Sequence, residues 1–239
     1  MMYDNICKGI FRERFNRFVA SVEIDGKTEK VHVKNTGRCR ELLVPGAVVY
    51  LEDHAENMRN RKLRYSLIAV EKHTDNGIML VNMDSQAPNK AVREALENGT
   101  ILPEGLIDTA YVKSEYSYGN SRIDFYIKDS EGNEALLEVK GVTLEEKGTA
   151  EFPDAPTERG IKHINELVGA MSEGYHSAIL FVIQMKGVHK FRPNYETHKD
   201  FGESLVKAAE AGVEIMAYDC RVERNYMGID RPVEIELMV

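Results

Sequence analysis

Residues 121–140 read Ser-Arg-Ile-Asp-Phe-Tyr-Ile-Lys-Asp-Ser-Glu-Gly-Asn-Glu-Ala-Leu-Leu-Glu-Val-Lys, and this stretch decides the fold around it. Apolar and polar residues alternate on both sides of the polar segment 129–133, which is the two-residue period of half-buried strands. Because the central segment is rich in turn formers, we expect an antiparallel hairpin. A hairpin centred on Glu131 places Asp124 opposite Glu138.

Two opposed carboxylates in this hairpin predict a divalent-metal site. Directly opposed residues have Cβ atoms roughly 5 Å apart, and like charges at that spacing destabilise a sheet. A hard cation relieves the repulsion, because Mg²⁺ takes oxygen ligands and typically uses one or two carboxylates. Lys140 shares a face with Glu138, so it would orient the attacking water or stabilise the pentacovalent phosphorus in phosphodiester hydrolysis. The alternative is a cross-strand salt bridge on a solvated face.

The arrangement of Asp124 and the triplet 138–140 resembles the core of the PD-(D/E)xK nuclease superfamily. The spacing alone is not distinctive. Glu-x-Lys recurs at 145–147 and Asp-x-Lys at 25–27, both in polar surroundings. The strand context therefore favours 138–140.

Three further segments resemble the signatures of the sugar fermentation stimulation protein family, and the resemblance covers essentially the whole chain. They are His-Val-Lys-Asn-Thr-Gly-Arg at 32–38, Ser-Arg-Ile-Asp-Phe at 121–125 and Phe-Pro-Asp-Ala-Pro-Thr-Glu-Arg-Gly-Ile-Lys-His at 152–163. One departure is Lys34, where the family usually has proline. The resemblance implies a two-domain α+β or α/β chain: an N-terminal OB-like five-stranded β-barrel, then a PD-(D/E)xK nuclease-like domain with a mixed central sheet flanked by helices. It also implies nucleic-acid binding and a link to sugar metabolism.

Periodicity and turn residues predict the elements of both parts. In the first part we expect strands at 18–23, 30–33, 48–51, 63–70 and 78–82. After it we expect a helix at 90–97, a strand at 111–116, the hairpin, a helix at 158–172, a strand at 178–184, a helix at 200–211 and a strand at 213–218. We place the OB-like domain at residues 1–85 and the nuclease-like domain at 86–239.

Charge is distributed unevenly along the chain. The net charge is −8, but residues 86–239 carry 17 basic and 27 acidic side chains, whereas residues 8–40 carry 9 basic and 4 acidic ones. A basic N-terminal segment indicates a phosphate-binding surface there. We predict nucleic-acid contacts from these residues: Arg12, Arg14, Arg17, Asn35 and Arg38. The alternative is that the arginines are solvated and the interleaved phenylalanines belong to the core.

Further residues are candidates to complete the site. The Val139 carbonyl and the Glu115 carboxylate would add oxygen ligands to those of Asp124 and Glu138. The polar side of the helix expected after Thr157, its predicted N-cap, would support phosphate binding or catalysis. The residues on that side are Arg159, Lys162, His163 and Glu166.

The sequence lacks the motifs of several classes of protein. The chain has no Gly-x-Gly-x-x-Gly, Walker, Gly-x-Ser-x-Gly or His-Glu-x-x-His motif, which excludes the nucleotide-binding, esterase and metalloprotease functions that depend on these motifs. No apolar run approaches the roughly 20 residues of a membrane span. Cys7, Cys39 and Cys220 are scattered, as expected of reduced thiols. We expect a cytoplasmic protein without a membrane partner.

These observations favour a nucleic-acid-binding phosphodiesterase that uses Mg²⁺ or Mn²⁺, with DNA favoured over RNA as partner. A rival interpretation is a DNA-binding regulator of sugar metabolism that keeps a nuclease-like fold without cleaving. A third is a protein-interaction module, which would leave the Asp124, Glu138 and Lys140 arrangement without a purpose. The sequence leaves open whether the chain forms a homo-oligomer.

Overall fold

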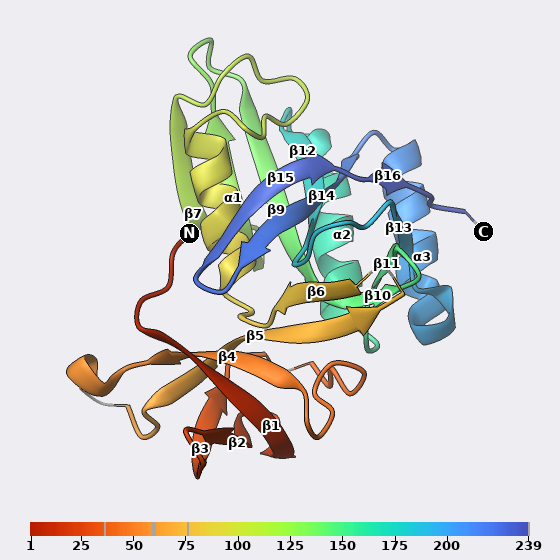
Figure 1. The fold of residues 1–239 in the computed structure, drawn as a ribbon. Coiled ribbons are helices and arrows are strands. Elements are labelled where there is room, and N and C mark those ends of the chain that lie inside the picture. The colour runs from red at the N-terminus through yellow and green to blue at the C-terminus, as the bar shows by residue number, and fades with distance from the viewer. Residues whose placement is uncertain (36, 59–60, 76, 239) are drawn as a thin grey trace.

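The computed structural model describes residues 1–35, 37–58, 61–75 and 77–238. Its strands and helices form an N-terminal domain of β-strands and a C-terminal domain in which helices cover a mixed sheet (Figure 1). The red and orange N-terminal strands lie below the C-terminal domain in that view.

In the described residues, the strands of the N-terminal domain are β1 (Ile6–Asn16), β2 (Val19–Ile24), β3 (Lys27–Val33), β4 (Val48–Asp53), β5 (Tyr65–Thr74) and β6 (Gly77–Asn82), with the short 3-10 helix η1 (Ala55–Asn57) after β4. The strand order is β3-β2-β1-β4-β5-β6, and β3 also pairs in parallel with β5. This second pairing joins β1 to β5 into a ring, while β6 extends the edge of β5. The predicted OB-like domain is confirmed.

In the N-terminal domain, β1 is the strand that the sequence did not predict, because its arginines and phenylalanines alternate in a way that fits a helix or a strand. The predicted strands correspond to β2 through β6. Phe11 of β1 is buried at 1% exposure, whereas Phe15 is 49% exposed. Asn16 ends β1, since its Oδ1 accepts the N–H groups of Phe18 at 2.8 Å and Val19 at 3.1 Å.

A six-stranded mixed sheet, in the order β15-β14-β12-β9-β8-β7, forms the centre of the C-terminal domain. Its strands are β7 (Tyr111–Tyr118), β8 (Ser121–Lys128), β9 (Glu134–Val142), β12 (His176–Ile183), β14 (Glu214–Glu223) and β15 (Tyr226–Pro232). β9, β12 and β14 are parallel, and the other neighbours are antiparallel. The predicted mixed sheet is confirmed.

A second, four-stranded sheet lies beside it in the order β10-β11-β13-β16. Its strands are β10 (Leu144–Glu146), β11 (Thr149–Phe152), β13 (Lys190–Pro193) and β16 (Glu234–Ile235). The sequence predicted neither these strands nor β15. The strands of the small sheet are two to four residues long, too short to show a period.

Three helices flank the central sheet: α1 (Ala87–Glu97), α2 (Glu158–Met171) and α3 (Tyr195–Glu210). Alternate residues of β12 pack on opposite sides, Leu180 in the cluster that contains α1 and Phe181 in the cluster that contains α2 and α3. Thr157 caps α2 as predicted, because its Oγ1 accepts the Gly160 N–H at 3.1 Å. Among the described residues, no helix is long and apolar enough to span a bilayer.

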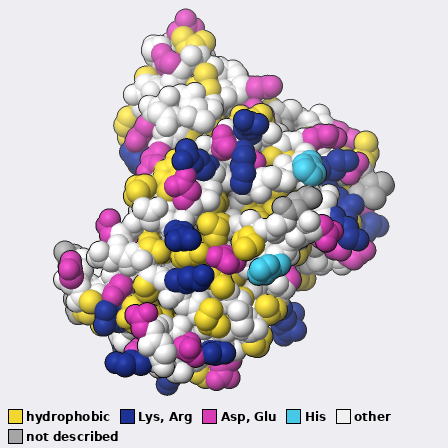
Figure 2. Space-filling view, viewed as in Figure 1, with side chains coloured by type: hydrophobic (Ala, Val, Ile, Leu, Met, Phe, Trp, Pro, Cys, Tyr) yellow, Lys and Arg dark blue, Asp and Glu magenta, His cyan; other side chains and the backbone are white. Residues whose placement is uncertain are grey.

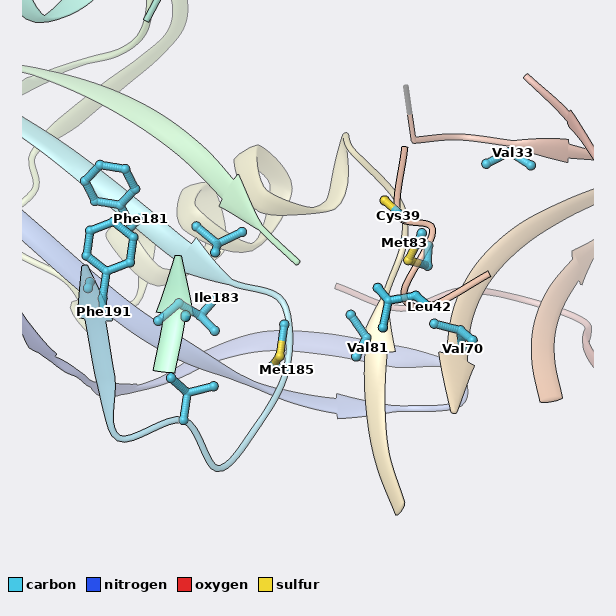
Figure 3. Close-up of a cluster of buried hydrophobic side chains, with 14 of the residues drawn as sticks. Val33, Cys39, Leu42, Val70, Val81, Met83, Phe181, Ile183, Met185 and Phe191 are labelled. Carbon is cyan, nitrogen blue, oxygen red and sulfur yellow. The ribbon is translucent and has the colours of Figure 1, made fainter. Parts of the chain in front are cut away.

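The two domains share a continuous core. Figure 3 shows its side chains where the domains meet, with Val33, Leu42, Val70, Val81 and Met83 on the N-terminal side and Ile183, Met185 and Phe191 on the C-terminal side. The Asn82 N–H donates to the Gln184 carbonyl at 2.8 Å. Met2, at the start of the chain, pairs with Tyr226 of the C-terminal domain. A division at residues 85 and 86 remains a proposal.

Candidate metal and nucleic-acid site

The β8–β9 hairpin has the register that its turn predicts. Phe125 pairs with Leu137, and continuing this register places Asp124 opposite Glu138. At this position the Asp124 side chain takes over a backbone contact, because its Oδ2 accepts the Val139 N–H at 2.8 Å. The hairpin therefore brings both predicted carboxylates to one place.

Asp124 is held by hydrogen bonds from two neighbouring elements, α1 and β9. Its Oδ1 accepts a hydrogen bond from Asn89 Nδ2 of α1 at 2.7 Å, and its Oδ2 accepts the Val139 N–H. Burial, followed by the nearby charge of Glu138, raises the pKa of Asp124 above its ordinary value. The two hydrogen bonds and the charge of Lys140 act in the opposite direction without reversing the shift.

Glu138 is buried at 2% exposure, and its two oxygens have different surroundings. Oε1 accepts from Lys140 Nζ at 2.6 Å and contacts His163 Nδ1 of α2. Oε2 is buried without a hydrogen-bond partner among the described residues. Burial raises the pKa of Glu138, but the hydrogen bonds from His163 and Lys140, together with the charge of Lys140, outweigh burial, so the pKa lies below its ordinary value. The pKa values of the two carboxylates are thus shifted in opposite directions.

His163 connects the carboxylate to the surface of α2. Its ring is buried at 4% exposure, and Arg159 Nε donates to His163 Nε2 at 3.3 Å. Arginine can only donate, so Nε2 is the accepting nitrogen and Nδ1 carries the proton that points at Glu138. The sequence predicted both residues as support, and they lie in one chain of contacts from Arg159 through His163 to Glu138.

Three other predicted residues lie outside this buried cluster. Glu115 lies between Ser114, which pairs with Phe125, and Tyr116, which pairs with Ile123, but its side chain is 71% exposed and contacts Arg122 at 3.2 Å. Lys162 is 54% exposed and lies 3.7 Å from Glu166. Glu166 Oε2 is also buried without a partner in the part of the chain that the structure describes. A metal-ligand role for Glu115 and a supporting role for Lys162 and Glu166 remain predictions.

The Asp124 and Glu138 carboxylates fit a hard divalent cation. Buried carboxylate oxygens are normally satisfied by hydrogen bonds or by metal, and Glu138 Oε2 has no hydrogen-bond partner among the described residues. Within those residues, no group of three or more carboxylate, imidazole or thiol side chains forms a ready metal cluster. A cation held here would therefore draw its remaining ligands from backbone, solvent or substrate, as Mg²⁺ typically does.

Asn89 is the site residue that sequence reasoning missed. It lies in the first turn of α1, two residues after the helix begins, and 35 residues before its partner Asp124. Its position after Pro88 marked the start of a helix and nothing more. Contact between the two residues depends on how α1 packs on the sheet, so no local pattern in the sequence could have revealed it.

Arg14 is hydrogen-bonded to the backbone around it. Its guanidinium donates to the carbonyls of Asn16, Arg17, Asn35, Gly37 and Arg38 at 2.6 to 3.2 Å. A guanidinium has five N–H donors, and here they are used by backbone. Arg14 therefore holds Asn35, Gly37 and Arg38 in place, and its contact with nucleic acid remains a prediction.

The other predicted nucleic-acid residues surround this loop. Arg17 and Arg38 are exposed and line a shallow hollow of about 360 Å³ together with Arg40. Arg12 pairs with Glu23 at 2.5 Å. Asn35 Oδ1 accepts the Gly37 N–H at 2.8 Å, which fixes the turn. Thr36, which the loop motif also includes, lies outside the described residues.

Figure 2 shows that Lys and Arg side chains alternate with Asp and Glu over the face seen in that view, including the N-terminal domain at the bottom. The basic excess of the N-terminal segment therefore forms no uninterrupted basic area on this face. The arginine-lined hollow instead adjoins the C-terminal domain, because Gly37 also lines a depression formed by Gly141 at the end of β9 and by Asp154.

Comparison with known proteins agrees with the two-domain description. Residues 13–81 match the family described as SfsA N-terminal OB domain, and residues 86–226 match the family described as Sugar fermentation stimulation protein RE domain. A sugar fermentation stimulation protein homolog from Desulfitobacterium hafniense is 49% identical over 238 residues, covering 100% of this chain and 99% of that protein. The homolog from Ruminiclostridium cellulolyticum is 51% identical over 237 residues, covering 99% and 100%.

Among solved structures, SfsA of Pyrococcus furiosus in complex with Ca²⁺ aligns with a TM-score of 0.86 and 31% identity, covering 99% of this chain and 98% of the other. The likeness thus extends over both domains in sequence and in structure. This chain belongs to the sugar fermentation stimulation protein family.

Proposed function

We propose that this protein binds nucleic acid, DNA in preference to RNA, and hydrolyses phosphodiester bonds with Mg²⁺ or Mn²⁺. The observation that carries the proposal is the buried pair of Asp124 and Glu138, in which one Glu138 oxygen has no hydrogen-bond partner among the described residues. A relative of 31% identity that was solved with Ca²⁺ adds support. The three free cysteines agree with a cytoplasmic location.

Asp124 and Glu138 would hold the cation, joined in our proposal by the Val139 carbonyl and Glu115. The bound cation would neutralise the carboxylates and polarise the phosphoryl group. Asn89 orients Asp124, and His163 orients Glu138. Lys140, 2.6 Å from Glu138, carries the positive charge that would stabilise the negative charge developing on the phosphoryl oxygens.

The exposed side chains around the 35–38 loop supply the surface for the nucleic acid. Arg17 and Arg38 line a hollow that shares Gly37 with the depression at the end of β9, the strand that carries Glu138 and Lys140. Phosphate contacts from such residues fix position without reading sequence. We therefore propose that the N-terminal domain holds the backbone of the strand that the C-terminal domain cleaves.

Metal titration together with cleavage tests this proposal. Metal that binds the folded chain alone should raise its stability by about 2.7 kcal/mol at a hundredfold excess over Kd. Asp124→Asn should abolish the calorimetric signal, whereas Glu151→Gln, which alters a carboxylate paired with Arg192 outside the site, should retain it. Labelled single- and double-stranded DNA and RNA should be cut only with metal. Equal metal affinity in the wild type and Asp124→Asn would refute the site.

A second candidate function is a DNA-binding regulator of sugar metabolism that does not cleave. One observation favours it: the Lys140 ammonium is engaged by Glu138 at 2.6 Å, and both Asp124 oxygens already accept hydrogen bonds. A structural ion-pair network would have the same contacts. Metal-independent DNA binding by a wild type that cuts no nucleic acid with either metal would select this function over the first.

A further inference from the structure

A second basic hollow, of about 420 Å³, lies between the tip of the β7–β8 hairpin and the first turns of α2. Its charged walls come from two different elements: Arg122 belongs to β8, whereas Arg159 and Lys162 belong to α2. The rest of the lining is uncharged apart from His163 and consists of Ser117, Asn120 and Ser121. It shares no residue with the hollow at Arg17 and Arg38.

The two outer cations are held weakly. Arg122 and its partner Glu115 are 63% and 71% exposed at a distance of 3.2 Å. Lys162 lies 3.7 Å from Glu166 and donates to the Asn120 carbonyl at 3.2 Å. Exposed ion pairs contribute about 0 to 1 kcal/mol, so exchanging these carboxylates for a phosphate costs little. A phosphate also offers arginine a geometry with two parallel hydrogen bonds.

The hollow is connected to the carboxylate site through a single side chain. Arg159, on its wall, donates to His163 Nε2 at 3.3 Å, and His163 Nδ1 contacts Glu138. An anion bound among the three cations would therefore lie close to the carboxylate site, separated from Glu138 by the imidazole of His163. Glu115 and Glu166 are the acidic side chains that pair with the hollow's cations, so an anion has two carboxylates to displace.

We propose that this hollow binds a backbone phosphate of the nucleic acid that neighbours the phosphodiester being cleaved. The inference rests on the proposed function and extends it, because it assigns the substrate a second contact region on the C-terminal domain. Arginine and lysine side chains at the rim recognise charge and not bases. The contact should thus strengthen binding of all sequences equally.

Salt-dependent binding of oligonucleotides tests the proposal. We would compare the wild type with Arg122→Ala/Lys162→Ala in chelator, so that no cleavage occurs. Each neutralised phosphate contributes about 0.7 to 0.9 to the slope of log affinity against log salt, so the double variant, which removes two of the three cations around this one phosphate, should flatten the slope by about 0.7 to 0.9. Arg159 is left unchanged because it contacts His163.

The matched control is Lys128→Ala/Lys199→Ala, which removes the same charge. Lys128 lies on the same strand as Arg122 and pairs with Glu134 at 3.4 Å, and Lys199 pairs with Glu203 at 3.3 Å. The control should keep the wild-type slope. If the two double variants have equal slopes while the wild type binds, the hollow is not a phosphate site and the proposed function stands. If the folded wild type binds no oligonucleotide, both proposals fail.

Discussion

Two Glu-x-Lys triplets, at 138–140 and 145–147, lie within one stretch of chain and fold into different environments. Glu138 and Glu145 are both almost fully buried, at 2% and 5% exposure. Glu145 Oε1 accepts the Gly148 N–H at 2.6 Å, and Oε2 contacts the Lys72 ammonium of β5. Both of its oxygens are satisfied, whereas Glu138 Oε2 has no partner among the described residues.

The difference shows that burial of a carboxylate beside a lysine does not by itself mark a site. Lys147 sits in a turn with a positive φ of 49°, and Lys72, which is distant in sequence, neutralises Glu145. Glu138 instead faces a second carboxylate, and its pKa and that of Asp124 are shifted apart. Opposed shifts in a titratable pair are typical of functional sites. The first triplet has the properties of a site and the second those of a structural ion pair.

The largest effect that we expect comes from the structural pair. Lys72→Met leaves the Glu145 carboxylate buried with the Gly148 N–H and without its counter-charge. Breaking a buried pair on one side costs about 3 to 5 kcal/mol, which urea denaturation would measure. Metal affinity of the folded protein should not change. The double variant Lys72→Met/Glu145→Gln should recover part of the loss, and a loss below 1 kcal/mol in the single variant would contradict the assignment.

The converse change is Lys140→Ala in the candidate site. Glu138 keeps its contact with His163, so the free energy of unfolding should fall less than for Lys72→Met. Cleavage should fall by about 10²-fold or more, because an interaction used in the transition state is lost. Single-turnover assays on the folded protein would measure it. An unchanged cleavage rate combined with a large loss of stability would place Lys140 with the structural pairs.

Much of the fold followed from local sequence patterns. Alternation and a central turn at 129–133 predicted the register that pairs Phe125 with Leu137, and Thr157 was recognised as the cap of α2. The resemblance supplied the OB-like topology, which strand counting did not. The strands of the small sheet were missed because their pairing joins residues far apart in the chain: β11 pairs with β13 across some 40 residues. Such short strands also carry no period of their own.

The candidate site was predictable to the extent that it lies on one hairpin. Asp124, Glu138 and Lys140 are close in sequence, so strand geometry alone brought them together. Asn89 was missed because its contact depends on helix packing. The carbonyl contacts of Arg14 were not predicted, because a surface arginine and one that binds loop carbonyls look alike in sequence. That Glu138 Oε2 has no hydrogen-bond partner in the described part of the chain is a property of packing that no residue pattern encodes.

The smallest expected effect concerns Asn89, which tests whether the site is held in place from α1. Asn89→Ala removes the 2.7 Å hydrogen bond to Asp124 Oδ1, so Asp124 keeps the Val139 N–H and gains freedom to rotate. Loss of a residue that orients a metal ligand typically weakens metal affinity by about 10- to 100-fold, and we expect the lower end because one hydrogen bond remains. Asn98→Ala, at the other end of the same helix, is the control for nonspecific effects on α1. Calorimetric titration of Mn²⁺ should show a weaker Kd for Asn89→Ala and an unchanged one for Asn98→Ala. If both variants bind metal equally and Asn89→Ala has a lower Tm, the Asn89 hydrogen bond is structural, as the contacts of Glu145 are. The contrast between the two triplets would then rest on Glu138 alone.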